Sequence, residues 1–206
     1  MEYLVTMTTH VPDGTSTDAV DAMRKREAAR SRELAAQRHL LRLWRPPLGP
    51  GEWRTLGLFA ANDDKELDQV LTSMPLRVWR TDEVMGFAPH PNDPRARTGA
   101  RTGATGTNGV EFFTTFTIGI PQGVPDRVVE DTNAREAQRA RELAEGGHLL
   151  RLWMPAPEPH GARAFGLWRA HDAAAMQTIM ELLPLYPWMR VETTPLSQHP
   201  NDPALS

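Results

Sequence analysis

The sequence predicts an α+β protein built from two copies of a βαββαβ unit. Three observations lead to this prediction. Two motifs, HLLRLW and HPNDP, each occur twice, and both pairs are separated by the same offset of 109 residues. That one offset places Tyr3–Pro94 over Phe112–Pro203 without a gap, which is typical of a tandem duplication. Within each copy, short β-type runs and longer amphipathic runs follow one another in the same order.

Each copy opens with a predicted strand, Tyr3–Thr9 or Phe112–Ile118, which alternates and is rich in Val, Ile, Thr and aromatic residues. A loop containing Pro and Gly leads to a long helix, expected over Thr17–Arg38 and Asp126–Glu145, with Thr17 or Asp126 as the N-cap. The elements that follow are the HLLRLW strand, a third strand (Arg54–Phe59, Arg163–Trp168), a second helix (Asp63–Met74 and its counterpart, ended by Pro75 and Pro184) and a last strand (Trp79–Phe87, Trp188–Leu196).

This order is that of the ferredoxin-like unit, which places both helices on one face of a four-stranded sheet. The other face of the sheet is apolar and must be covered. In a duplicated chain the natural cover is the sheet of the other copy, so we expect an intramolecular, pseudo-dimeric α+β barrel with sheet packed on sheet. The predicted domains are a first repeat at 1–94, a flexible linker rich in Gly, Thr and Arg at 95–111, and a second repeat at 112–206.

Composition excludes several classes of function. The net charge of −3 argues against a nucleic-acid surface, and no apolar run approaches the length of a membrane span. The first residues lack the basic and apolar regions of a secretory signal, so we expect a cytoplasmic protein. The chain has no cysteine, which excludes disulfides, thiolate metal sites and cysteine nucleophiles. We expect no cofactor and no bound metal, because no phosphate-binding loop or metal-ligand spacing is present.

A glutamate lies on the apolar stripe of each long helix. Glu27 follows Met23 by four residues and precedes Leu34 by seven, so all three share one helix face. The second copy repeats this arrangement with Glu136. Burial raises the pKa of a carboxyl group toward neutrality, as an acid–base group requires. The alternative is a structural role, in which the glutamate pairs with a neighbouring arginine or with Arg42.

The HLLRLW strand supplies a second group of candidates. Alternation places Arg42 and Trp44 on one face and Arg45 on the other. A fixed cation beside a tryptophan can hold a small anionic or planar substrate. Arg151 and Trp153 repeat the pair in the second copy, where Met154 takes the place of Arg45. The alternative is that both tryptophans belong to the core.

The histidines of the HPNDP motifs, His90 and His199, come directly after the last strands. A role as general acid or ligand is one interpretation. The composition of the motif favours a turn that ends the strand.

Taken together, these residues resemble the muconolactone Δ-isomerase family. The features that carry the resemblance are the first strand ending in a Pro loop, Glu27 on the first helix and LWR at Leu43–Arg45. To these is added the run LPLYPWM at Leu183–Met189, followed by Val191–Glu192 and His199–Pro200. The resemblance covers each copy nearly from end to end.

The resemblance implies cofactor-free isomerisation of a small unsaturated lactone acid, as in aromatic catabolism. Glu27 and Glu136 match the family's glutamate that shuttles a proton between two carbons. Arg45 matches an arginine suited to the substrate carboxylate, and Trp44 and Trp153 match a pocket tryptophan. Family members assemble into oligomers, so further association of the pseudo-dimers is also implied.

The chain departs from the family pattern at several positions. Where the family has a histidine before LWR, both copies have an arginine, Arg42 and Arg151, which are second candidates for holding a substrate carboxylate. The second copy keeps Tyr186 and Trp188 as candidate substrate-binding residues, where the first has Arg77-Val78-Trp79. The alternatives are an isomerase, cyclase or cofactor-free monooxygenase acting on a larger, polyketide-type molecule, and a barrel that binds a ligand without catalysis.

Overall fold

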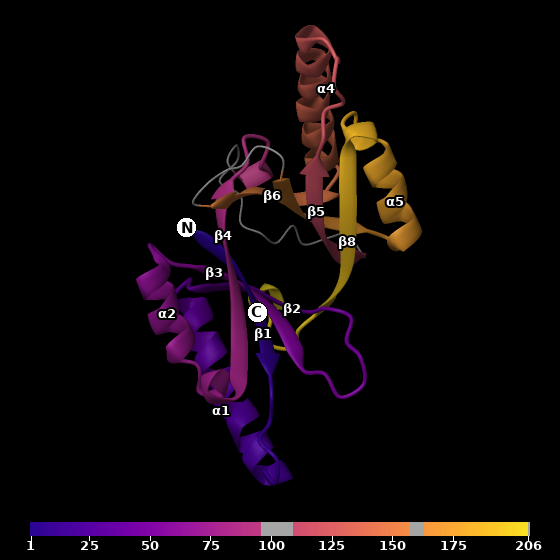
Figure 1. Cartoon of the computed structure of the whole chain (residues 1–206). Coiled ribbons are helices and arrows are strands. Elements are labelled where there is room, and N and C mark those ends of the chain that lie inside the picture. The colour runs from indigo at the N-terminus through magenta and orange to yellow at the C-terminus, as the bar shows by residue number, and fades with distance from the viewer. Residues whose placement is uncertain (96–108, 157–162, 206) are drawn as a thin grey trace. The chain divides into compact units, whose positions relative to one another are not determined.

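The computed structural model describes residues 1–95, 109–156 and 163–205, and both repeats have the predicted βαββαβ order (Figure 1). The elements of the first repeat are β1 (Glu2–Thr9), α1 (Thr17–Ala36), β2 (Leu40–Arg45), β3 (Arg54–Ala60), α2 (Asp64–Thr72), the short helix η1 (Pro75–Trp79) and β4 (Arg80–Pro89). Those of the second are β5 (Val110–Ile118), α4 (Asp126–Glu145), β6 (Leu149–Ala156), β7 (Arg163–Ala170), α5 (Ala173–Glu181), η2 (Tyr186–Trp188), β8 (Met189–Gln198) and η3 (Pro203–Leu205).

All strand pairs within the repeats are antiparallel. The strand order is β4-β1-β3-β2 in the first repeat and β8-β5-β7-β6 in the second. Tyr3 of β1 lies opposite Phe59 of β3, and Phe112 of β5 lies opposite Trp168 of β7. The offset of 109 residues is therefore preserved in the hydrogen-bond register as well as in the sequence.

A β-bulge interrupts the second strand of each repeat. The pairing of β2 with β3 shifts between Leu40 and Arg42, and the pairing of β6 with β7 shifts between Leu149 and Arg151. Strict alternation over HLLRLW does not predict this extra residue. Beyond the bulge the alternation resumes, so Arg42 and Trp44 share one face while Arg45 lies on the other.

The long helices begin and end close to the predicted residues. Ser16, one residue before the predicted Thr17, caps α1 by accepting a hydrogen bond on Oγ from the Ala19 N–H at 3.3 Å. At α4 the cap position is Pro125, which makes no side-chain cap hydrogen bond. The first helix ends at Ala36, two residues before the predicted end, because Arg38 adopts a left-handed conformation with φ of 63°.

The helices and strands of each repeat share one apolar core. The predicted apolar positions of the second helices are buried, among them Leu67 and Val70 in α2 and Met176 and Ile179 in α5. Leu34 of α1 and Leu67 belong to the same core cluster as Tyr3 and Phe59, so both helices cover the same sheet face. No helix within the described residues has the length and apolar character needed to cross a bilayer.

The compact units of the chain differ from its sequence repeats. One unit comprises Met1–Phe87 and Ser197–Ser206, and the other comprises Ala88–Leu196. Each unit therefore contains the HPNDP tail of the other repeat. The predicted turns are present in these tails, where the Asp93 N–H donates to the His90 carbonyl at 2.8 Å and the Asp202 N–H donates to the His199 carbonyl at 2.9 Å. Most of the predicted linker, residues 96–108, lies outside the described part of the chain.

Candidate active site

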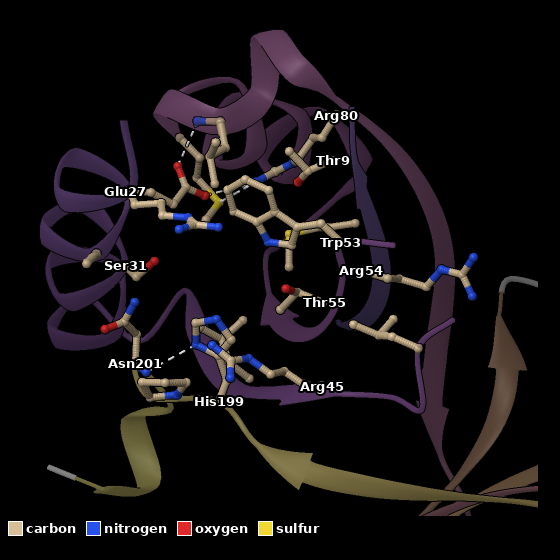
Figure 2. Close-up of a pocket in the computed structure, with 18 of the residues that line it drawn as sticks. Thr9, Glu27, Ser31, Arg45, Trp53, Arg54, Thr55, Arg80, His199 and Asn201 are labelled. Atoms are coloured by element: carbon tan, nitrogen blue, oxygen red, sulfur yellow. Dashed lines mark hydrogen bonds and ion pairs between the residues drawn. The ribbon is translucent and has the colours of Figure 1, made fainter. Parts of the chain in front are cut away.

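Glu27 projects from α1 toward the beginning of η1, and its side chain is only 12% exposed. Its Oε2 atom accepts a hydrogen bond from the Leu76 N–H at 2.8 Å (Figure 2). This N–H is available because the first N–H groups of a helix have no partner within the helix, and Pro75 before it has none to offer. The carboxylate is therefore fixed to the backbone at one oxygen, while its second oxygen is turned toward Arg80.

Arg80, the first residue of β4, is shared between two carboxylates. Its Nη1 atom lies 3.1 Å from Oε1 of Glu27, and its Nε atom lies 2.7 Å from Oδ1 of Asp82. The Arg80 and Asp82 side chains are 1% and 3% exposed. Burial raises the pKa of Glu27, while the Leu76 N–H and the Arg80 guanidinium oppose that rise. Glu27 is thus paired with an arginine, but with Arg80 rather than with Arg42.

Glu27 opens onto a cavity of about 620 Å³ in the first unit. Five cationic side chains and two carboxylates are among the residues that line it: Arg24, Lys25, Arg45, Arg54, Arg80, Glu27 and Glu52. The guanidinium of Arg24 stacks over the Trp53 ring, with its Cζ atom 4.6 Å from the ring centre. An excess of fixed cations around an open cavity attracts and holds a small anion.

The tail of the second repeat completes this cavity with His199 and Asn201, which face it from the side opposite Glu27 (Figure 2). Nδ1 of His199 accepts a hydrogen bond from the Asn201 N–H at 3.1 Å, so the proton of the neutral ring lies on Nε2. Burial and the neighbouring Arg45 lower the pKa of His199 to about 4, although Asp202 opposes this shift. His199 is therefore an uncharged hydrogen-bond donor at neutral pH.

The structure gives Arg42 and Trp44 a different position from the one expected for substrate-binding residues. Arg42 is 3% exposed and forms an ion pair with Asp202, with Nη2 3.0 Å from Oδ2, and the Leu43 N–H donates to the same carboxylate at 3.1 Å. The guanidinium lies 4.7 Å from the centre of the buried Trp44 ring. Strand alternation turns both side chains away from the cavity that Arg45 lines. They anchor the HPNDP tail instead.

The second unit repeats this anchor. Arg151 lies 3.1 Å from Asp93 and stacks over Trp153 at 4.8 Å. Neither residue is among the described residues that line the cavity of that unit. Tyr186 and Trp188 are half-buried in η2 and also lie outside that lining, and the Tyr186 hydroxyl accepts a hydrogen bond from Gln177 at 2.9 Å.

Glu136 occupies the corresponding place in a smaller cavity of about 340 Å³ in the second unit. Its Oε2 atom accepts a hydrogen bond from the Leu185 N–H at 2.9 Å. Burial raises the pKa of Glu136, and among the described residues the Leu185 N–H alone opposes that rise. The residue equivalent to Arg80 is Met189, so the second carboxylate lacks the arginine that accompanies the first.

Among the cavity residues that sequence reasoning missed are Arg80, Arg54, Trp53 and the two tail histidines. The pairing of Arg80 with Glu27 spans 53 positions, and no local periodicity reveals it. The histidines carried a signal, because their motif recurs at the offset of HLLRLW. The structure shows that His199 lines the cavity of Glu27 and His90 lines that of Glu136.

Comparison with known proteins places these features in a family. The sequence model described as "Muconolactone delta-isomerase" matches residues 1–93 and again residues 110–202. Muconolactone Delta-isomerase of Cupriavidus pinatubonensis is 28% identical over 90 residues, which are 44% of this chain and 95% of that protein. Muconolactone Delta-isomerase 1 of Acinetobacter lwoffii is 27% identical over 90 residues, or 44% and 91% of the two chains.

Solved structures resemble the whole chain at lower identity. Chlorite dismutase from Candidatus Nitrospira defluvii superimposes with a TM-score of 0.56 at 12% identity, covering 97% of this chain and 92% of that one. A heme-binding protein from Thermus thermophilus gives a TM-score of 0.58 at 10% identity, covering 98% and 93%. At such identities the likeness is one of fold alone. It confirms the predicted fold class, an α+β barrel of two ferredoxin-like repeats.

Proposed function

Because the chain belongs to the muconolactone Δ-isomerase family through both of its repeats, we propose that it is an isomerase. In the first cavity it shifts a double bond within a small unsaturated lactone acid or a related anion. The observation that carries this proposal is the largely buried Glu27 carboxylate, which opens onto a cavity lined by five cationic side chains.

The reaction requires a group that can take up a proton and return it. The Glu27 carboxylate removes a proton from the carbon next to the conjugated system, and the electrons of that C–H bond move into the system to form a dienolate. Protonated Glu27 then returns the proton to another carbon, so the isomerisation is balanced without a redox partner. A pKa raised by burial suits both steps, since the group must be a base first and an acid afterwards.

The other lining residues supply charge and hydrogen bonds. Arg45 and Arg54 approach the cavity from β2 and β3 and can hold the substrate carboxylate, while Arg80 lies beside Glu27 and offsets the negative charge that develops in the dienolate. His199 adds an uncharged donor. We extend the proposal to Glu136 as the acid–base group of the second cavity, whose apolar lining suits a different substrate.

The test is turnover of muconolactone in deuterated buffer, followed by ultraviolet absorbance and by the mass of the product. We expect Glu27→Gln to lower kcat by about 100-fold or more, because the amide cannot accept the proton. Glu33→Gln is the matched control, since Glu33 lies on the same helix with a side chain 60% exposed, and it should retain the wild-type rate.

A thermal melt of both variants separates catalysis from a structural role. If Glu27 served only in the ion pair with Arg80, Glu27→Gln would lower the melting temperature and leave the rate of the folded protein unchanged. If the wild-type protein neither converted muconolactone nor catalysed the exchange of muconolactone protons with solvent, this substrate would be removed from the proposal.

A further inference from the structure

The cavity of the second unit is lined mainly by apolar side chains. Those that the structure describes are Phe116, Ile118, Ala137, Ala140, Leu152, Ala164, Trp168, Leu183, Leu185 and Met189. The other described lining residues are Glu136, His90, Pro91, Asn92 and Asn133. Burial lowers the pKa of His90, so its ring is neutral near pH 7. Glu136 is therefore the one ionisable acid in this described lining, and no cation accompanies it there.

Comparison with the first cavity shows that polar residues have been replaced at equivalent positions. The first unit has polar side chains where the second has apolar ones, in the pairs Thr9 and Ile118, Ser31 and Ala140, Thr55 and Ala164, and Arg80 and Met189. Phe59 is also replaced by Trp168, whose indole N–H donates to the Thr114 hydroxyl at 2.9 Å. These changes remove the groups that would hold an anion and bring more hydrocarbon to the wall.

One oxygen of Glu136 remains available to a ligand. The Leu185 N–H binds Oε2, and Oε1 accepts no hydrogen bond from the described residues. No fully buried side-chain oxygen in the described ranges lacks a hydrogen-bond partner, so Oε1 must be accessible from the cavity. A hydroxyl group suits this oxygen in either state of the carboxyl, because it donates to a carboxylate and accepts from a carboxylic acid.

From this lining we infer that the second cavity binds an uncharged, largely hydrocarbon molecule, aromatic or polycyclic, that places a hydroxyl group against Glu136. A ligand carboxylate would be disfavoured there, because it would be desolvated beside Glu136 without a described cation to compensate it. The volume of about 340 Å³ lies within the range of small-molecule sites. This inference concerns binding in the second cavity and is independent of the isomerase chemistry of the first.

The test uses two probes with the same ring system, 2-naphthol and 2-naphthoate, in isothermal titration calorimetry of the full chain. A matched pair of variants assigns the site. Ala137→Phe narrows the second cavity, and Ala28→Phe makes the same change at the equivalent position of the first. We expect Ala137→Phe to weaken 2-naphthol binding by about tenfold or more and Ala28→Phe to leave it within about twofold. In the Ala28→Phe protein, 2-naphthoate should bind at least about tenfold more weakly than 2-naphthol.

Met189→Arg keeps the test decisive if Ala137→Phe fails to fold, as judged by a thermal melt. This variant introduces into the second cavity an arginine equivalent to Arg80 of the first. In an Ala28→Phe background it should therefore weaken the binding of 2-naphthol and strengthen the binding of 2-naphthoate. The inference is overturned if 2-naphthol does not bind the wild-type protein, if Ala137→Phe leaves its binding unchanged, or if 2-naphthoate binds the Ala28→Phe protein as tightly as 2-naphthol. Muconolactone turnover is assigned to the first cavity, so its loss in a variant would bear on the proposed function and not on this inference.

Discussion

In both units a glutamate from the long helix accepts a hydrogen bond from the backbone N–H of a leucine that lies just before the last strand. The distances are 2.8 Å from Leu76 to Glu27 and 2.9 Å from Leu185 to Glu136. Arg80 and several further cationic side chains lie around the first glutamate, whereas Met189 and other apolar side chains lie around the second. The scaffold that buries and orients the carboxylate is therefore the same in both units, whereas the charge of a few wall side chains differs between the two cavities.

The feature that the two units share most fully is the buried anchor of the tail, and its removal should have the largest effect. Asp202→Ala leaves the Arg42 guanidinium buried without its carboxylate, and Asp93→Ala does the same to Arg151. We expect each variant to lose about 3–5 kcal/mol in the free energy of unfolding, measured by urea denaturation.

Asp21→Ala is the control for the anchors, because its pair with Arg24 is exposed and should contribute less than about 1 kcal/mol. If one anchor proved as dispensable as this surface pair, the two units would differ in stability as well as in charge. The two anchors would then be equivalent in geometry but not in their contribution to stability.

A second experiment gives the first cavity the residues that the second unit has beside its glutamate. Arg80→Met with Asp82→Val introduces the residues found at positions 189 and 191, and the double change avoids leaving Asp82 buried without Arg80. We expect kcat/KM for an anionic substrate to fall by about 10- to 100-fold, because a cation beside the reacting carboxylate is lost.

The same variant should shift the pH–rate profile. Arg80 lowers the pKa of Glu27 through its charge and its hydrogen bond, whereas the charge of Asp82 raises it by less. Removal of both therefore raises the pKa of Glu27 further and moves the acid limb of the profile to higher pH. An acid limb that moved to lower pH would contradict the role of Arg80 in opposing the rise in the pKa of Glu27. A lower rate with an unmoved profile would make Arg80 a substrate anchor alone.

A smaller effect is expected from the tail histidine of the first cavity. The pKa of His199 is lowered to about 4 in the folded protein, mainly by burial and by Arg45, from an ordinary value of 6.5. The unfolded chain therefore binds the proton first, so the stability that the neutral ring provides is complete above pH 6.5 and is lost as the pH falls toward 4. His199→Gln should reduce this acid sensitivity by about 1–2 kcal/mol, less than the full shift implies because the ring keeps some contact with solvent.

The measurement is the free energy of unfolding of His199→Gln and the wild type at a series of pH values through that window. His10→Gln is the control, because His10 is exposed. If the two variants lost stability in parallel on acidification, protonation of His199 would affect stability no more than protonation of an exposed histidine.

Much of the fold could be predicted because it depends on local signals repeated at one offset. The duplication fixed the order of the elements, and helical spacing placed Glu27 and Glu136 on the buried faces of α1 and α4. The bulge at Leu41 could not be predicted, because an extra strand residue leaves no mark in a run of alternating large side chains.

The limits of the site prediction are also physical. Arg42 and Arg45 lie on one strand, and the position of the HPNDP tail of the second repeat determines which of the two forms a buried ion pair. Asp202, its partner, lies 160 positions away. Arg80 likewise reaches Glu27 through the tertiary fold, so its role is invisible to any window of local sequence.

The HPNDP tails, each of which belongs to the unit of the other repeat, also affect the order in which the two units can be completed during synthesis. The second unit consists of residues 88–196, whereas the first unit takes residues 197–206 from the far end of the second repeat. During synthesis the second unit can therefore be complete while the first, although made earlier, still awaits His199 and Asp202. The cation-lined cavity is completed only after the apolar one, and a nascent chain interrupted before Ser197 would lack His199 and Asn201 from its lining.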